Sequence, residues 1–308
     1  MKFLHLIRYK NLLLLAVMQL IFRLGYLEQI KIPLSLFYWQ YSLLILATLL
    51  IAAGGYVIND IFDQETDAIN KPNKTIVGDY LSEAKAYNLY AALTIAGVGC
   101  GFILANSVAH PNFAIIFVLI ATLLYFYAST LKQMALIGNI MAAALVAFSV
   151  IIIGVFDIFP NTFDINRPQM SVAFAILMDY AKFAFIINLV REIVKDIQDI
   201  KGDKEQGMNT LPIAIGITKT NKIAFVLLLI PTLYLFYYLN NYLFANNLFY
   251  GILYMFVFVI APMILGLVRL WNAKEADDYG QLSTLLKWVM FFGIVSVAVI
   301  TYNIKHHA

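Results

Sequence analysis

Charged residues are scarce in this sequence. Asp, Glu, Lys and Arg make up 13% of its 308 residues, whereas soluble globular proteins carry roughly 25%. Hydrophobic residues make up 62% and aromatic residues 15%, an apolar excess too large for one buried core. A soluble domain is therefore excluded, and recurring apolar runs of about 20 residues predict helices that cross a bilayer.

Cysteine and histidine are also rare. The single cysteine, Cys100, lies in an apolar run, which excludes an intrachain disulfide and a metal site built from cysteines. The four histidines, His5, His110, His306 and His307, are terminal or in a loop and lack the spacing of metal ligands. The formal net charge of +3 is small, so no nucleic-acid partner is expected.

Nine apolar segments are long enough to span a membrane. They lie near residues 11–30, 36–58, 84–106, 111–130, 135–157, 170–192, 221–242, 246–270 and 284–304. The first is the weakest, because Arg23 and Glu28 interrupt it. No separate soluble domain is evident, so residues 1–308 are interpreted as one all-α, polytopic membrane domain.

The basic residues are distributed unevenly between the two sides of the predicted membrane. With the N-terminus in the cytoplasm, most of them lie in the N-terminal tail and in the connections after spans two, four, six and eight. The opposite side holds Arg23, Lys31, Arg167 and Lys305, and Lys182 lies within a span. This bias follows the positive-inside rule. It predicts a multi-pass protein of the plasma (inner) membrane with the second and sixth connections in the cytoplasm.

Those two cytoplasmic connections are rich in carboxylates. Six aspartates share the spacing i, i+3, i+7: Asp60, Asp63 and Asp67 in the first, and Asp196, Asp199 and Asp203 in the second. Residues so spaced lie on one face of a helix, where like charges repel unless a cation compensates. Mg²⁺ prefers oxygen ligands and is commonly held by one or two carboxylates plus substrate phosphates. Two facing clusters therefore predict magnesium sites that grip a diphosphate, and solvated helix ends are the structural alternative.

The sequence around these aspartates resembles the UbiA superfamily of membrane prenyltransferases over nearly the whole chain. In chain order, the matching stretches are Asn59-Asp60-x-x-Asp63-x-x-x-Asp67, Tyr127-x-x-x-Leu131-Lys132, Gly138-Asn139, Asp196-x-x-Asp199-x-x-Gly202-Asp203 and Thr210-Leu211-Pro212. The first and fourth stretches resemble the two aspartate signatures of the family, and the Tyr127 stretch is similar to its tyrosine–lysine motif. The paired signatures are the specific part of this resemblance.

The resemblance implies nine helices around a central cavity, an allylic prenyl diphosphate donor and two Mg²⁺ ions. Asn59 and the aspartates of the first signature would form one metal–diphosphate site, and those of the second signature the other, with Asp63, Asp196 and Asp199 taking part in catalysis. Tyr127 would stabilise the allylic cation that remains after ionisation, and Lys132 would face the leaving group. Further candidates for binding the donor lie beside the motifs, although topology alone also explains them: Lys71, Lys74, Arg191, Lys195 and Lys201.

The acceptor is suggested by the string Arg191-Glu192-x-x-Lys195-Asp196. Within the family it is most similar to digeranylgeranylglyceryl phosphate synthases, with some similarity to chlorophyll synthases. The 4-hydroxybenzoate polyprenyltransferases usually carry an aspartate and a Tyr-Ala pair in place of Glu192 and Ile193-Val194. The favoured reaction transfers a prenyl group, geranylgeranyl, to a hydroxyl of a prenylated glycerol phosphate. Prenylation of an aromatic or quinone-precursor acceptor is the alternative.

A non-enzymatic function is suggested by two charged residues inside the sixth span, Asp179 and Lys182. Intramembrane charges often mark transport pathways, and a possible repeat of four helices would suit an ion-coupled transporter. Their i, i+3 spacing also allows them simply to pair. The transporter is disfavoured because the clustered carboxylates lie at helix ends. A magnesium-binding structural membrane protein would leave the Tyr127 motif unexplained.

Overall fold

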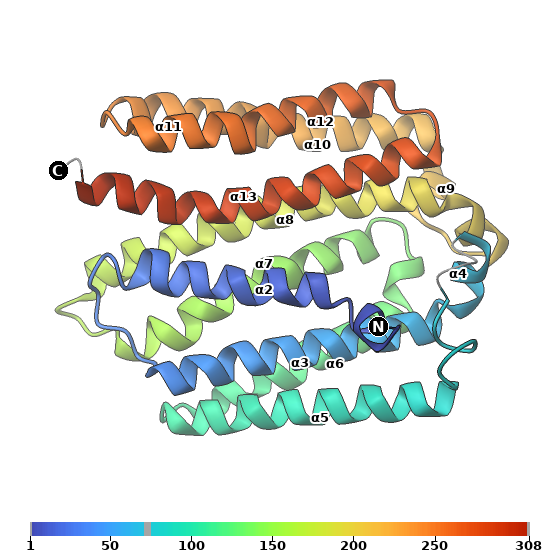
Figure 1. The fold of residues 1–308 in the computed structure, drawn as a ribbon, viewed down its shortest axis with the longest axis horizontal. Helices are drawn as coiled ribbons and strands as arrows, with labels where there is room; N and C mark the ends of the chain where they lie inside the picture. The colour runs from blue at the N-terminus through green and yellow to red at the C-terminus, as the bar shows by residue number, and fades with distance from the viewer. Residues whose placement is uncertain (1, 71–74, 307–308) are drawn as a thin grey trace.

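The computed structural model describes residues 2–70 and 75–306, which fold into helices (Figure 1). Within these residues, nine helical segments are long and apolar enough to cross a membrane: Tyr9–Leu27, Tyr38–Phe62, Glu83–Ser107, Pro111–Ser129, Ile137–Asn161, Arg167–Glu205, Ile217–Phe244, Phe249–Asn272 and Ala276–His306. They overlap the nine predicted spans one for one. The prediction of an all-α, polytopic membrane fold is confirmed.

The spans are built from long helices, some of which are extended by irregular turns. The helices that make up the spans are α2 (Tyr9–Leu20), α3 (Tyr38–Phe62), α5 (Glu83–Ser107), α6 (Ala114–Ser129), α7 (Ile137–Asp157), α8 (Arg167–Glu205), α10 (Ile217–Tyr238), α11 (Phe249–Met255), α12 (Ala261–Asn272) and α13 (Ala276–His306). Short helices are α1 (Lys2–Leu6), α4 (Gln64–Asn70) and α9 (Leu211–Ile215). The segments Ile21–Leu27, Leu239–Phe244 and Phe256–Ile260 are π-helical.

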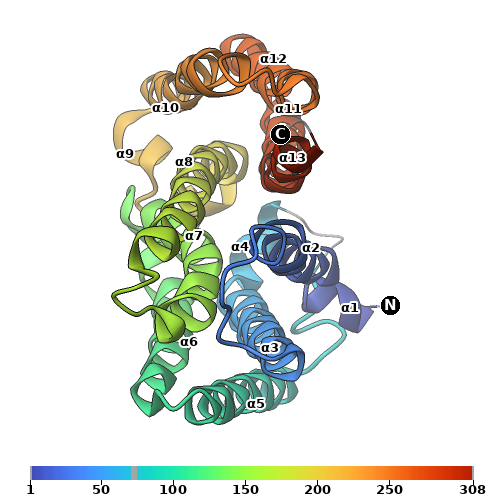
Figure 2. The same cartoon turned by 90° about the vertical axis from the view of Figure 1, so that its left-hand side faces the viewer.

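Viewed along their axes, the long helices follow one another around a ring (Figure 2). The ring runs from α2 through α3, α5, α6, α7, α8 and α10 to α12, and α13 then packs against the π-helical extension of α2. Helices α4 and α9 lie at the same end of the molecule, on the right in Figure 1. We call this the aspartate end, because α3 and α8 deliver both aspartate signatures to it.

Helix α8 is much longer than the predicted sixth span. Its 39 residues rise about 58 Å at 1.5 Å per residue, almost twice the roughly 30 Å of bilayer hydrocarbon. The sequence pattern places the apolar part before Arg191, and the helix continues without a break to Glu205. The second signature therefore lies on the part of α8 that extends beyond the apolar span.

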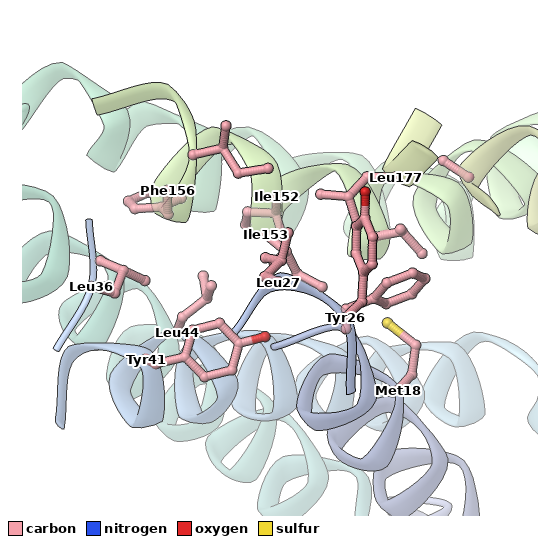
Figure 3. Packing of buried hydrophobic residues seen from close by; sticks show 14 of the residues in the cluster. Met18, Tyr26, Leu27, Leu36, Tyr41, Leu44, Ile152, Ile153, Phe156 and Leu177 are labelled. Atoms are coloured by element: carbon pink, nitrogen blue, oxygen red, sulfur yellow. The ribbon is translucent and has the colours of Figure 1, made fainter. Parts of the chain in front are cut away.

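A hydrophobic core joins the first half of the chain to α8. Met18 and Tyr26 at the start of the chain, Tyr41 of α3, Ile152 of α7 and Leu177 of α8 pack into it (Figure 3). A second buried cluster holds α8 against α10, α11, α12 and α13. Helices α7, α8 and α13 contribute to both clusters and so connect the two halves of the ring.

The charge that weakens the first predicted span is buried. Arg23 is 6% exposed and bonds to Asp157 of α7, which is fully buried. Its Nε also donates to Glu28 Oε1 at 2.9 Å, and its Nη2 donates to the Leu36 carbonyl at 2.8 Å. The amide of Leu36 completes the network by donating to Asp157 Oδ1 at 3.0 Å. Arg23 was predicted on the outer side, and it lies at the end of the bundle opposite the aspartates, where it links the π-helical segment Ile21–Leu27, the following loop and α7.

Candidate active site

The first aspartate signature spans the junction of α3 and α4. Asp60 lies in the last turn of α3, Asp63 follows its end, and Asp67 lies in α4. The Asp67 amide donates to the Asp63 carbonyl at 2.8 Å. The Asn59 side chain donates to the Asp63 carboxylate. The three aspartates therefore do not share one unbroken helix, because α3 ends at Phe62 and α4 begins at Gln64; Asn59 orients one of the carboxylates.

Two cations from distant segments reach this signature. Arg8, between α1 and α2, places Nη2 2.9 Å from Asp60 Oδ1 and its guanidinium 5.0 Å from the centre of the Tyr56 ring. Burial acts to lower the pKa of Arg8, but the Asp60 carboxylate outweighs it and raises the pKa above its ordinary value. Lys132 forms an ion pair with Asp63. Each of these two aspartates is thus paired with a basic side chain of the protein.

The second signature lies on the last turns of α8. Asp196 Oδ2 accepts a hydrogen bond of 2.8 Å from Asn139 Nδ2, which lies in the first turn of α7. Asp199 is half-buried, and Asp203 is buried at 7% exposure. The three residues occupy one continuous helix, as their spacing predicts.

Asn70 connects the two signatures. At the end of α4, its Nδ2 donates to the Asp199 carbonyl at 3.0 Å, and its Oδ1 accepts from the Gly202 amide at 2.9 Å. A Cβ at position 202 would lie 2.5–2.8 Å from the Asn70 amide group, closer than packed atoms allow. The glycine of the second signature is therefore needed for this close approach, which fixes α4 against α8.

Tyr127 lies between the two signatures. It is half-buried in the last turns of α6 and within electrostatic range of Asp63 on one side and of Glu192 and Asp196 on the other. The structure thus brings the tyrosine of the central motif to the place where two carboxylate sets converge. The role that the resemblance implies for Tyr127 stays a prediction.

The turn that carries Lys132 is fixed by its neighbours. It is a single 3₁₀ turn, Leu131–Gln133, directly before α7. A Cβ at Gly138 would lie 2.7 Å from Lys132 Cα, so glycine lets α7 begin against this turn. The Asn209 amide donates to the Gln133 carbonyl at 2.9 Å. The loop after α8 therefore holds the lysine turn at the aspartate end.

The predicted donor-binding cations divide into three groups. Arg191 and Lys195 both bind Glu192, at 2.9 and 2.8 Å, one turn before Asp196. Lys201 is exposed on α8. Lys71 and Lys74 lie outside the described residues. The structure therefore places Arg191 and Lys195 beside the second signature.

Three polar residues of the site were not predicted from the sequence: Arg8, Asn70 and Asn139. Arg8 was counted only for its charge, and its partner Asp60 lies 52 positions away. Asn139 was noted within the matching Gly138-Asn139 stretch without a role. These residues reach the site through the packing of distant segments, and the spacing of residues along the sequence does not predict such contacts.

The intramembrane pair lies apart from this site. Lys182 Nζ is 3.0 Å from Asp179 Oδ1, and both side chains are exposed. They line an open groove of about 500 Å³ on the outer part of α8. The helical rise places Asp179 about 25 Å from Asp196 along α8. Of the two interpretations, the simple pair is the one that the structure supports.

The carboxylates of the two signatures fit Mg²⁺ ions whose remaining ligands come from the substrate phosphates and from water. Within the described residues, no group of three or more His, Cys, Asp or Glu side chains is gathered closely enough to hold a metal by itself. Mg²⁺ usually keeps waters and binds one or two carboxylates together with substrate phosphates. The contacts of Arg8 and Asn139 each occupy one carboxylate oxygen, of Asp60 and Asp196, and leave the second oxygen as a ligand.

Comparison with known proteins gives consistent results. The chain is 32% identical to a digeranylgeranylglyceryl phosphate synthase of Sulfurisphaera tokodaii, over 78% of this chain and 80% of the relative. It is 33% identical to that of Saccharolobus solfataricus over 79% and 80%. A solved structure described as digeranylgeranylglyceryl phosphate synthase in membranes has 28% identity and a TM-score of 0.61, covering 99% and 98% of the two chains.

More distant structures share the fold. A UbiA homologue from Archaeoglobus fulgidus, bound to DMAPP and Mg²⁺, has 16% identity and a TM-score of 0.58, and covers 96% of this chain and 99% of its own. The model of the UbiA prenyltransferase family matches residues 25–302, which include every described residue of both signatures. The chain is a membrane prenyltransferase and belongs to the UbiA prenyltransferase family.

Proposed function

We propose that this prenyltransferase transfers a geranylgeranyl group from its diphosphate to a hydroxyl of a prenylated glycerol phosphate, forming an ether. The observation that carries the proposal is that the two aspartate signatures meet at one end of the bundle, where Asn70 at the end of α4 bonds to the Asp199 carbonyl and the Gly202 amide of α8. Its relatives of 32% and 33% identity are digeranylgeranylglyceryl phosphate synthases, which supports this donor and this acceptor.

The donor diphosphate binds between the two signatures. Asp60, Asp63 and Asp67 would hold Mg²⁺ on one side, and Asp196, Asp199 and Asp203 on the other. When bound, Mg²⁺ neutralises the diphosphate and makes it a better leaving group. Lys132 forms an ion pair with Asp63. From this position it can contact a phosphate oxygen of the donor as negative charge develops on the leaving diphosphate. Asn59, Arg191 and Lys195 surround the same region, and Lys71, Lys74 and Lys201 are further candidates.

The reaction begins with ionisation of the donor. The bond between the allylic carbon and the diphosphate oxygen breaks, and its electron pair leaves with the diphosphate. The Tyr127 ring presents its face to the allylic cation, an interaction worth about 2 kcal/mol or more in a desolvated site. The acceptor oxygen then forms the new bond to carbon, and a carboxylate of the second signature takes its proton.

A second candidate acceptor is an aromatic or quinone-precursor compound, as in 4-hydroxybenzoate prenyltransferases or chlorophyll synthases. The same donor chemistry would serve it. Glu192 and the apolar pair Ile193-Val194 disfavour it, because they depart from the aspartate and Tyr-Ala of the 4-hydroxybenzoate enzymes. The glycerol phosphate acceptor is therefore the one proposed.

The active site faces the cytoplasm in this proposal, and the protein lies in the plasma membrane. The support is the bias of Lys and Arg toward the aspartate end, together with the position of Arg8 and Lys132 on the first signature. Both substrates are lipids with anionic headgroups, so they would reach the site from the cytoplasmic leaflet.

The experiment that tests the proposal uses purified protein in detergent, labelled geranylgeranyl diphosphate and each acceptor in turn. We expect a labelled ether from the prenylated glycerol phosphate. Labelled product from 4-hydroxybenzoate alone would replace the proposed acceptor. A donor with fluorine beside the allylic carbon should react much more slowly while binding nearly as well, because fluorine destabilises the cation. A normal rate with chemistry limiting would rule out ionisation first.

A further inference from the structure

A group of basic side chains from three different helices includes the two that precede the second aspartate signature on α8. It consists of Lys10 on α2, Arg191 and Lys195 on α8, and Lys287 on α13, and we call it the basic cluster. Lys287 Nζ donates to Asn11 Oδ1 at 2.7 Å, which ties α13 to α2. Lys287 also lies within electrostatic range of Arg191 and Lys10. Helices distant in sequence thus bring like charges together.

The basic cluster carries more positive charge than the carboxylate bonded to it neutralises. Arg191 and Lys195 share one carboxylate, that of Glu192, whereas Lys287 bonds to a neutral amide. Arg191 Nε is buried, and among the described residues no acceptor lies within hydrogen-bond distance of it. A buried donor without an acceptor costs free energy, and like charges held together repel. An anion bound here would relieve both.

The position of the basic cluster separates it from the magnesium ligands. Lys195 directly precedes Asp196, and Arg191 lies about 1.4 helical turns before it, on the side nearer the apolar span. Lys10 and Lys287 lie on helices that carry neither signature. In a glycerol phosphate, a free hydroxyl is at most two carbons from the phosphorylated carbon. The phosphate of an acceptor whose hydroxyl reaches the allylic carbon must therefore bind close to Asp196.

We propose that the basic cluster binds the phosphate monoester of the acceptor, an inference that rests on the proposed function and reassigns Arg191 and Lys195 from the donor diphosphate to the acceptor. A phosphate monoester carries about −1.5 to −2 charges near neutral pH, which would offset at least half of the excess. The guanidinium of Arg191 can bind phosphate through parallel N–H donors, including the Nε that lacks a protein acceptor. The basic cluster then selects phosphorylated acceptors over neutral prenylated glycerols and holds the hydroxyl beside the donor.

The test compares two acceptors, the prenylated glycerol phosphate and the same lipid without its phosphate. Lys287→Met and Lys10→Met should each raise the KM for the phosphorylated acceptor by about tenfold, the effect of one charge-assisted contact. The KM for the donor and the kcat/KM for the neutral acceptor should not change. Lys10 is exposed, so its variant should fold even if Lys287→Met does not. Lys305→Met, which replaces an exposed basic residue in the last turn of α13, about 27 Å along the helix from Lys287, is the matched control and should behave as the wild type.

Three results would contradict binding of the acceptor phosphate by the basic cluster. A raised donor KM would assign the basic cluster to the diphosphate, and equal losses with both acceptors would assign it a structural role. A difference that disappears in vesicles of phosphatidylcholine, which lack anionic lipid, would assign it to a membrane headgroup. Each of these results overturns the inference and leaves the proposed function standing. Failure of the wild type to use any prenylated glycerol phosphate overturns both.

Discussion

Asn70 and Gly202 meet across the two aspartate signatures, with the Gly202 amide donating to Asn70 Oδ1 at 2.9 Å. The contact brings the end of α4 onto α8 at the one position of the second signature that has no side chain. It follows that the spacing between the two carboxylate sets depends on a residue that contributes no charge. Replacing either partner should therefore alter catalysis through geometry.

Gly202→Ala should reduce kcat/KM by about 10- to 100-fold, because a displacement of about 1 Å near reacting groups has effects of up to this size. The added methyl group would push Asn70 away, since it would lie 2.5 Å from its Nδ2. Stability should change by no more than about 1 kcal/mol, because alanine is favoured in helices. The control is Gly99→Ala in α5, where a Cβ meets no atom within 4 Å. Steady-state rates and thermal unfolding of both variants check this, and full activity of Gly202→Ala would contradict it.

The aspartates should be needed for turnover and not for folding. Asp63→Ala and Asp199→Ala should each lower activity by orders of magnitude, because each removes a predicted magnesium ligand and charge neutralisation of the leaving group is lost. EDTA should abolish wild-type activity, and added Mg²⁺ should restore it. Undiminished activity in EDTA, or in both variants, would exclude a mechanism with two metal–aspartate sites.

Tyr127 should act through its ring. Tyr127→Phe keeps the aromatic face and should retain more activity than Tyr127→Leu, which keeps an apolar side chain but loses the interaction with the allylic cation. The measurement is kcat with saturating donor, so that differences in donor binding do not enter. Equal inactivity of the two variants would mean that the hydroxyl carries the role.

The buried network of Arg23 and Asp157, at the end opposite the aspartates, should stabilise the fold and have no effect on catalysis. Arg23→Met leaves Asp157 charged and unpaired in a buried site, which costs about 3–5 kcal/mol. The double variant Arg23→Met/Asp157→Leu should be more stable than the sum of the single losses predicts. Arg167→Met is the control, because its pair with Asp164 is exposed and should contribute little. Unfolding midpoints in one detergent give the comparison, and additive losses would show that the two residues are not coupled.

The aspartate end should face the cytoplasm. In a Cys100→Ala background, Ser82→Cys, an exposed position before α5, should resist an impermeant thiol reagent in intact cells. Asp164→Cys, between α7 and α8 at the opposite end, should react and serves as the external control. Equal labelling at both positions would contradict the proposed orientation.

The spans and signatures were predictable because each depends on local sequence. Long apolar runs mark helices of membrane length, and the i, i+3, i+7 spacing places the aspartates of the second signature on one helix face. The partners of these groups were not predictable in this way. Arg23 and Asp157 are 134 positions apart, and Arg8 and Asp60 are 52 apart. Their pairing depends on how the helices pack, and a single charged residue has the same local sequence signal whether it ends in solvent or in an ion pair.

The unbroken course of α8 has a consequence for where the chemistry takes place relative to the lipid. One rigid rod joins the outer end, at Arg167, to Asp203 at the other, so the height of the second signature above the hydrocarbon is fixed by helical rise. Isoprenoid tails can remain in lipid while the diphosphate stays at the level of the headgroups. A thicker or thinner bilayer would tilt or shift the whole protein and would leave the distance from tail to headgroup sites unchanged.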